Sequence, residues 1–297
     1  MEINYSFIIP HRNCPDLLNR CLASIPQRGD IQIIVVDDNS DEGKKPSISR
    51  DDVELILLDA ANSKGAGRAR NVGLEYAKGK WLLFADADDY YTECLSTILD
   101  KYVDDDKTDI VYLNAEIFDD NNNLRGCGVN RLIDNYLSQK DYAELELRYG
   151  FWTPWSRMVK NEVVKSNKIR FDEIPAGNDM MFGLKTSKYS KTISVEPSVV
   201  YMYFRPSKKS QTDRMRNVQM LSDRIQMLND RITLYKDVNY PAIPSFLHFA
   251  FKSKYTGGLS ISKRMTIYIE MLSKNRISLF KDVYRYLYRK YYVKKYN

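Results

Sequence analysis

The sequence has few of the residues that bind soft metal ions. Its 297 residues include two histidines, and its four cysteines show no close paired spacing. These features argue against a zinc site and against a disulfide framework, and the cysteines read as free thiols of a reducing compartment. Any metal ion is therefore expected to be held by oxygen atoms.

Long apolar runs are also missing. No run approaches the roughly 18 residues that a membrane-spanning helix needs, and the amino terminus lacks the basic and apolar regions of a secretion signal. We therefore expect a cytoplasmic protein. Hydrophobic residues make up 43% of the chain and the formal net charge is +6, which together are typical of a folded globular protein. No nucleic-acid-binding module is recognised, so no nucleic-acid partner is expected.

Short apolar runs alternate with helical patterns in the first half of the chain. This alternation predicts an α/β fold with a mixed, mostly parallel sheet flanked by helices. Strands are expected at 5–10, 31–36, 53–58, 81–85, 110–115, 192–195 and 199–204. Helices are expected at 16–25, 67–77, 161–166 and 180–187, with an irregular connection at 121–134.

The pattern becomes purely helical after residue 210. We expect a core domain at 1–210, with halves at about 1–118 and about 119–210, and a helical C-terminal extension at 211–297. Apolar residues of the extension recur at three-four spacing, so they must pack against the chain itself or, as the alternative, against a second copy in a homodimer. This seam contains Val218, Leu221, Ile225, Leu228, Ile232 and Tyr235.

Three carboxylates follow the apolar run at 81–85, and open α/β sheets bind ligands at this end of their strands. On extended backbone, Asp86 and Asp88 would point the same way. Two negative charges on one face favour a bound cation, and a hard divalent ion often bridges protein carboxylates to a diphosphate. The alternative is a solvated acidic turn before a helix that begins near Thr92.

Four motifs occur in a fixed order and together carry a resemblance. They are Phe7-Ile8-Ile9-Pro10 followed by Asn13, then Val35-Val36-Asp37-Asp38-Asn39-Ser40, then Gly67-Arg68-Ala69-Arg70-Asn71-Val72-Gly73, and then Asp86-Ala87-Asp88-Asp89. In these motifs the sequence resembles the inverting family 2 glycosyltransferases, which have the GT-A fold. The resemblance continues through Trp155, Asn178-Asp179 and Tyr201 to Arg205, and so covers about 5–211.

The resemblance implies a site for a nucleotide diphosphate sugar, with UDP as the expected nucleotide. It places this site in the half at about 1–118 and the acceptor in the half at about 119–210. Asp88, with Asp86 beside it, would hold Mn²⁺ or Mg²⁺ against the diphosphate. Arg70 offers a guanidinium fork for phosphate or the base. The full set of expected donor-site residues is Pro10, Asn13, Asp37, Asp38, Lys64, Arg70, Asp86, Ala87 and Asp88.

An inverting transfer needs a base for the acceptor hydroxyl, and Asp179 matches the family's acidic position. The preceding residue is Asn178, where the family commonly has Glu. The alternative role for Asp179 is as the N-cap of the following helix. Trp152 and Trp155 offer ring faces for a sugar acceptor, with Asn178 beside them, although packing in the core is the alternative for Trp155.

The last helix pattern is basic and aromatic. This composition suits contact with an anionic membrane surface, and the alternative is packing against the core domain with a solvated basic side. The apolar positions are Leu279, Phe280, Val283, Tyr284, Leu287, Tyr288 and Tyr291.

The resemblance therefore predicts an enzyme, a metal-dependent hexosyltransferase. It would move a sugar to a hydroxyl of a glycan or lipid-linked glycan in surface polysaccharide synthesis, as a cytoplasmic or peripheral membrane protein. The alternatives are a nucleotidyltransferase and a non-catalytic protein that binds a nucleotide sugar or a glycan. A nucleotidyltransferase usually needs a glycine-rich basic loop near the first strand, and Arg12 alone does not supply one.

Overall fold

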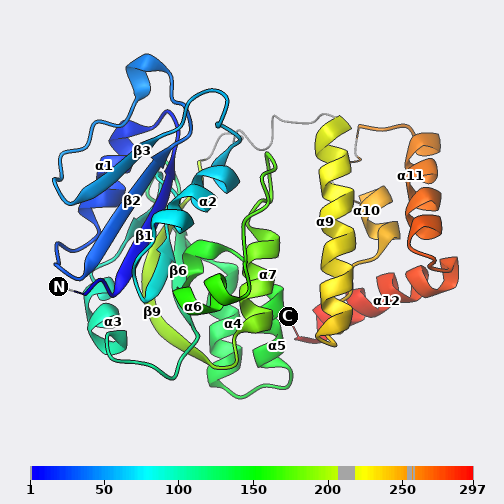
Figure 1. The fold of residues 1–297 in the computed structure, drawn as a ribbon. Helices are drawn as coiled ribbons and strands as arrows, with labels where there is room; N and C mark the ends of the chain where they lie inside the picture. Colours follow the sequence, from blue (N-terminus) through cyan, green and yellow to red (C-terminus); the bar gives the residue numbers. More distant parts are fainter. Residues whose placement is uncertain (1, 207–217, 253–255, 257, 297) are drawn as a thin grey trace. The chain divides into compact units, whose positions relative to one another are not determined.

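The computed structural model describes residues 2–206, 218–252, 256 and 258–296. The chain forms two compact units, Met1–Ser210 and Gln211–Asn297. The first is built on a sheet flanked by helices and the second is helical. Figure 1 shows the elements of both units. The sheet runs through both predicted halves of the first unit, so the finer division near residue 118 stays a prediction.

In the described part of the chain, nine strands form one mixed sheet in the order β3-β2-β1-β4-β8-β6-β9-β5, with β7 paired to β6. The strands β3, β2, β1 and β4 are parallel, and β8 is antiparallel to both of its neighbours. The strands are β1 (Tyr5–His11), β2 (Ile31–Asp37), β3 (Val53–Leu57), β4 (Trp81–Phe84), β5 (Tyr90–Tyr91), β6 (Ile110–Phe118), β7 (Leu124–Gly126), β8 (Arg157–Lys160) and β9 (Ile193–Phe204).

Alternate residues of β1 touch helices on opposite faces of the sheet, as the two-residue period of a strand requires. The Tyr5 hydroxyl donates to the Leu99 carbonyl on one face, whereas Ile8 lies against Gly73 on the other. The helices of this unit are α1 (Pro15–Ala23), α2 (Ala66–Tyr76), α3 (Cys94–Tyr102), α4 (Gly128–Leu137), α5 (Ala143–Gly150), α6 (Asn161–Ser166) and α7 (Met180–Tyr189), with single 3₁₀ turns at Glu42–Lys44 and Pro154–Ser156.

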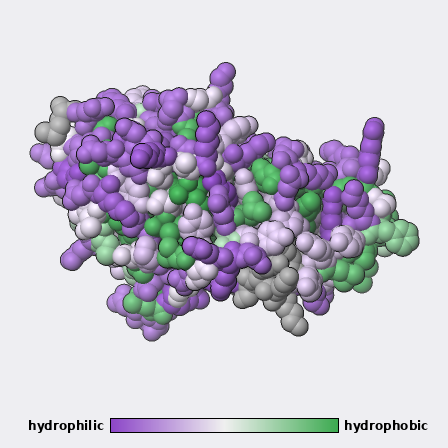
Figure 2. All heavy atoms as spheres, turned by 90° about the horizontal axis from the view of Figure 1, so that it is seen from below, coloured by the Kyte–Doolittle hydropathy of each residue, from purple (hydrophilic) through white to green (hydrophobic). Residues whose placement is uncertain are grey.

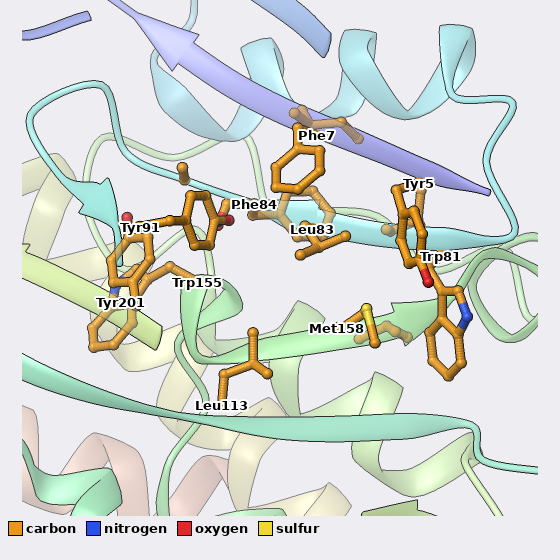
Figure 3. Close-up of a cluster of buried hydrophobic side chains, with 14 of the residues drawn as sticks. Tyr5, Phe7, Trp81, Leu83, Phe84, Tyr91, Leu113, Trp155, Met158 and Tyr201 are labelled. Carbon is orange, nitrogen blue, oxygen red and sulfur yellow. The ribbon is translucent and has the colours of Figure 1, made fainter. Parts of the chain in front are cut away.

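The core of the first unit lies between the sheet and these helices. Figure 3 shows the side chains of Phe7, Phe84, Tyr91 and Tyr201 gathered in it. The rings of Phe7 and Tyr91 pack edge to face with their centres 5.5 Å apart, and the rings of Tyr91 and Tyr201 do the same at 5.1 Å. Aromatic packing thereby joins β1, β5 and β9, and the Tyr91 hydroxyl donates to the Phe84 carbonyl of β4 at 3.0 Å.

Three expectations about elements need correction. The connection at 121–134 is not irregular, because it contains β7 and most of α4. The strands expected at 192–195 and 199–204 form one strand, β9, with an irregular register opposite Asn114, whose amide donates to the Pro197 carbonyl at 2.7 Å. The helix expected near Thr92 begins at Cys94, and the Thr92 hydroxyl accepts from its first N–H at 3.3 Å.

The second unit consists of α9 (Val218–Asp237), α10 (Phe246–Lys252), α11 (Ile261–Lys274) and α12 (Leu279–Tyr296). The predicted seam lies on α9, where Leu228, Ile232 and Tyr235 are buried. Leu228 and Ile232 pack in one cluster with Phe246 and Met271, so this part of the seam is covered by the chain itself. None of the helices in the described residues is long and apolar enough to cross a membrane.

Candidate active site

Three adjacent parallel strands bring most of the predicted donor residues together at their carboxyl ends, and Lys64 and Arg70 come from the start of α2 and the loop before it. His11 at the end of β1 lies opposite Asp37 at the end of β2, and the acidic motif follows β4 on the other side of β1. Pro10 is the partly buried residue before His11. The order β2-β1-β4 therefore gathers carboxylates that lie far apart in the sequence.

Asp37 points into the protein and holds the loop after β2. Its carboxylate accepts from the Ser40 hydroxyl at 2.6 Å and from the Ser40 N–H at 3.0 Å. It also lies 2.7 Å from Nδ1 of His11. The other ring nitrogen, Nε2, accepts from the Cys14 N–H at 3.2 Å, so the neutral ring carries its proton on Nδ1 and donates to Asp37. The sequence motifs did not predict a role for His11, because its contact with Asp37 depends on the register of β1 and β2.

Asn13 joins the same two loops. It has a left-handed backbone (φ 60°), which asparagine tolerates. Its N–H donates to the Ser40 hydroxyl at 2.8 Å, and its side-chain oxygen accepts from the Asp41 N–H at 2.8 Å. The Asn13 side chain is therefore engaged in bonds within the protein.

Asp38 is the carboxylate of this pair with capacity for a ligand. Its Oδ2 accepts from the Gly65 N–H at 3.0 Å and from Arg12 at 3.3 Å. Its Oδ1 is buried and, within the described residues, has no hydrogen-bond partner. A buried acceptor without a donor is costly, and a base N–H or a sugar hydroxyl would satisfy it.

Arg70 links the acidic motif to the loop before α7. One terminal nitrogen donates to Oδ1 of Asp86, and the other donates to the Asn178 side-chain oxygen at 2.8 Å. The guanidinium also lies over the Phe171 ring at 5.4 Å from its centre. Its buried Nε has no hydrogen-bond partner in the described part of the chain. Asn178 is thus buried and bonded to Arg70, and its role in binding the acceptor stays a prediction.

Asp88 has the properties of a metal ligand. Burial, with the nearby charge of Asp86, raises the pKa of its carboxyl to about 6. This carboxylate accepts a hydrogen bond from its own backbone N–H. Its backbone carbonyl accepts from Arg20 at 2.6 Å, and Ala87 before it is buried. Arg20 itself lies over three aromatic rings, at 5.2 to 5.9 Å from the centres of Phe118, Tyr90 and Phe204.

A hard divalent cation fits this donor set. It would offset the burial and the repulsion from Asp86, which together raise the pKa of Asp88. No group of three or more His, Cys, Asp or Glu side chains able to hold a metal ion occurs among the residues that the structure describes. Asp88 and Asp86 are the side chains that would hold such an ion.

Asp89, the last acid of the motif, is structural. It is fully buried, and burial raises the pKa of its carboxyl well above the ordinary value. It accepts from the Tyr201 hydroxyl and from the Phe204 N–H, both at 2.6 Å. The Tyr201 hydroxyl in turn accepts from the Asp86 N–H at 3.0 Å. The motif is therefore fastened to β9 and is not a solvated turn.

Asp179 stands at the N-cap position of α7, but its side chain makes no capping hydrogen bond. Its carbonyl accepts from the Gly183 N–H at 3.0 Å. The fully buried Arg157 is close enough for the Asp179 charge to act on its pKa, which burial lowers. The alternative role as a side-chain N-cap is thus absent, and the role of Asp179 as the base stays a prediction.

The two tryptophans differ in exposure. Trp155 is buried and stacks on Tyr201 and Tyr203, with ring centres 5.0 and 5.2 Å apart; Figure 3 shows it beside Tyr201. The structure therefore places it in the core, where little of its ring can meet a sugar. Trp152 is partly exposed. Its backbone carbonyl packs closely against Gly183, since a Cβ added at Gly183 would lie 2.0 Å from the carbonyl oxygen.

Lys64 lies at the surface before α2. Its ammonium is 3.5 Å from Glu173, which also lies 3.5 Å from Arg68. At the first turn of α2, a Cβ on Gly67 would lie 2.2 Å from the Asp172 carbonyl oxygen, so only glycine permits this close approach. The start of α2 and the loop that carries Asn178 are therefore packed backbone to backbone.

Comparison with known sequences identifies relatives. The profile of "Glycosyl transferase family 2" matches residues 6–163, just over half of the 297 residues. The chain is 26% identical over 207 residues to a poly(ribitol-phosphate) beta-glucosyltransferase of Bacillus spizizenii, covering 67% of this chain and 32% of that protein. It is 23% identical over 209 residues to TarS of Staphylococcus aureus, a poly(ribitol-phosphate) beta-N-acetylglucosaminyltransferase, covering 68% and 35%. The chain thus spans about a third of the length of these two relatives.

Solved structures have the same fold. The crystal structure of S. aureus TarS 1-349 in complex with UDP-GlcNAc superposes with a TM-score of 0.69 at 18% identity, covering 92% of this chain and 80% of that chain. A mannosyltransferase of Pyrobaculum calidifontis in complex with GDP-Man and Mn²⁺ has a TM-score of 0.50 at 15% identity, covering 92% and 75%. The predicted GT-A fold is confirmed.

Proposed function

Because the chain belongs to glycosyl transferase family 2, we propose that it moves one sugar from a nucleotide diphosphate donor to a hydroxyl of a surface glycan, with inversion at the transferred carbon. The observation that carries this proposal is the arrangement of side chains at the carboxyl ends of β2, β1 and β4. It holds a buried acceptor on Asp38 and the largely buried carboxylate of Asp88, and the neighbouring α2 adds a buried donor on Arg70. A nucleotide diphosphate sugar has complementary groups for all three.

The nucleoside would bind over the ends of β1 and β2. Oδ1 of Asp38 would accept from a base N–H or a ribose hydroxyl, while Asp37, His11 and Asn13 keep the two loops in place. UDP is the proposed nucleotide, because a structural neighbour, TarS, was solved with UDP-GlcNAc. Lys64 is exposed and would approach the donor only by leaving Glu173.

Asp88 and Asp86 would hold Mn²⁺ or Mg²⁺ at the diphosphate. When bound, such an ion supplies charge stabilisation to the departing nucleotide. Arg70 donates a hydrogen bond to Asp86 and so keeps this carboxylate in place. The Nε of Arg70, which is buried without a partner in the described residues, would be the donor to the ligand. The raised pKa of Asp88, about 6, means that its carboxylate is mostly ionised at neutral pH and is available as a ligand.

Asp179 would take the proton from the attacking hydroxyl. This role is supported by a side chain that is not used to cap α7. The link from Asn178 through Arg70 to Asp86 places the residue before the proposed base on the same network as the acidic motif. General-base catalysis by one carboxylate contributes typically about 10² to 10⁴ in rate.

The acceptor would be a hydroxyl-bearing glycan, free or lipid-linked, that approaches Trp152. This proposal is supported by two relatives whose names give poly(ribitol-phosphate) as their acceptor. Trp152 is the more exposed of the two predicted acceptor aromatics. Trp155 would shape the site from beneath through its stack with Tyr201 and Tyr203.

The first experiment is a calorimetric titration of UDP into the full chain, with Mn²⁺ and with a chelator. We expect binding that needs the metal and is lost in Asp88→Ala. The control is Asp51→Ala, which removes an exposed carboxylate near the start of β3. No binding of UDP, GDP or dTDP would refute a donor site. Binding without turnover of any donor sugar would instead indicate a non-catalytic binding protein.

A further inference from the structure

The helix α12 is amphipathic, but its apolar side faces outward. At 100° per residue, Phe280, Tyr284, Leu287 and Tyr291 form one stripe along it, and all four are exposed. Phe280 is 86% exposed. We call these four residues the outer stripe. Hydrophobic side chains of an ordinary surface helix face the core, so this orientation needs a reason.

The orientation is fixed by a buried carboxylate on the opposite side. Asp282 is fully buried and accepts from the N–H groups of Phe246 and Leu247, at 3.0 and 2.8 Å, and from the Ser245 hydroxyl at 3.1 Å. Asp282 thereby satisfies the free N–H groups at the start of α10. Arg285 on the same side is also buried. Turning the outer stripe inward would expose α10 and break these bonds.

Basic residues surround the outer stripe. Lys281 and Lys290 flank it on either side and are exposed, and Lys274 and Arg276 precede the helix at the surface. From residue 259 to the end, the sequence has ten lysines and arginines against two acids, Glu270 and Asp282, of which Asp282 faces inward. The exposed surface around the stripe therefore carries positive charge.

The neighbouring helix α11 has an outward apolar row as well. Ile261, Met265 and Ile269 recur every fourth residue and are exposed. Figure 2 shows hydrophobic side chains gathered at the end of the helical unit that carries α11 and α12. Contiguous exposed apolar surface of this kind marks an interaction site.

We propose that the outer stripe docks this protein onto an anionic lipid surface, with α12 lying in the plane of the interface. Phenylalanine and leucine would enter the acyl boundary, tyrosines would sit at headgroup depth, and the flanking lysines would meet lipid phosphates. A symmetric pair of copies is a poorer occupant, because an isologous contact would bring Lys281 and Lys290 of one copy near those of the other. This proposal is independent of the transfer reaction.

The test measures co-sedimentation of the full chain with vesicles. One set contains phosphatidylglycerol and phosphatidylcholine in equal parts, and the other contains phosphatidylcholine alone. We expect binding to the anionic vesicles that weakens with salt, because exposed charges are screened. Leu287→Ser should weaken the binding about tenfold, in line with the loss of one buried apolar side chain. Lys281→Glu with Lys290→Glu should weaken it further.

The matched control is Leu57→Ser, because Leu57 in β3 and Leu287 are both 57% exposed. This variant should bind vesicles as the unaltered chain does. Absence of binding to anionic vesicles, or equal binding to both sets, would overturn the proposal. A dimer in sedimentation that Leu287→Ser abolishes, without vesicle binding, would assign the stripe to a second copy. A lower melting temperature in Leu287→Ser, without vesicle binding, would assign it to packing within the chain.

Discussion

Asn178 accepts a hydrogen bond from Arg70 at 2.8 Å, on the same guanidinium that binds Asp86. The residue before the proposed base is thus joined to the acidic motif through one side chain. With a neutral amide at position 178, Asp86 is the one carboxylate bonded to Arg70 among the described residues. We therefore expect a change at one end of this link to affect the other.

Replacing Arg70 with lysine tests this link. An ammonium cannot bond to two partners in the fixed geometry of a guanidinium fork, so we expect Arg70→Lys to weaken UDP binding at least about tenfold, and turnover by more. Calorimetry and initial rates measure the two effects. The control is Arg68→Lys, whose guanidinium approaches the exposed Glu173 at 3.5 Å. Equal losses in both variants would show that the link has no special role.

Asp179→Asn removes the proposed base while keeping the shape of the side chain. We expect kcat to fall by about 10² to 10⁴, the usual contribution of a general base, with the affinity for UDP unchanged. Asp134→Asn, which removes an exposed carboxylate from α4, serves as the control. A kcat within a few-fold of the unaltered chain would exclude Asp179 as the base.

Metal-dependent UDP binding should weaken as the pH falls through about 6, because protonation of Asp88 removes a metal ligand. Below that value we expect the affinity to fall up to about tenfold per pH unit. The stability without metal runs the opposite way. Since the folded-state pKa of Asp88 is raised, the folded form binds more protons between the ordinary value of 3.8 and about 6, and stability falls as the pH rises through this window.

Denaturant unfolding at several pH values, with a chelator present, measures this second effect. In Asp88→Asn the decrease in stability between pH 4 and 6 should be smaller, because the variant lacks the titrating carboxyl. Asp51→Asn should leave the profile unchanged. An unaltered profile in Asp88→Asn would show that Asp88 titrates normally.

Gly67→Ala should destabilise the first unit by about 1 to 3 kcal/mol, a typical cost of overpacking. The added Cβ would lie 2.2 Å from the Asp172 carbonyl oxygen and 3.0 Å from Cβ of Asn178. Gly43→Ala is the matched control, because nothing lies within 4 Å of its added Cβ. Urea unfolding followed by tryptophan fluorescence compares the two, and equal stability would refute the close approach.

Asp282→Ala should destabilise the second unit by about 2 to 4 kcal/mol, because three donors at the start of α10 lose their acceptor. Thermal unfolding followed by far-UV circular dichroism would measure the loss. The control is Glu270→Ala, which removes an exposed carboxylate from α11. A melting temperature unchanged in Asp282→Ala would show that α10 does not depend on this contact.

Much of the fold follows from local sequence patterns. The period of the apolar runs predicts the parallel strands, and their topology places Asp38 and Asp86 at one edge. Features that depend on contacts between distant residues could not be predicted in this way. The bond between His11 and Asp37 depends on the register of two strands. The outward orientation of the stripe on α12 depends on the contact of Asp282 with α10. Helical periodicity predicts that the apolar residues share one face, but it does not predict whether that face points inward or outward.

The aromatic stack at Trp155 makes the acidic motif optically observable. The indole lies on Tyr201, whose hydroxyl joins the N–H of Asp86 to the carboxylate of Asp89. A displacement of the motif is thereby transmitted to a fluorophore already present in the chain. Of the other two tryptophans, Trp81 is fully buried at the far end of β4. We therefore expect ligand entry at the motif to change the intrinsic emission, with Trp152→Phe removing the signal of the partly exposed third tryptophan.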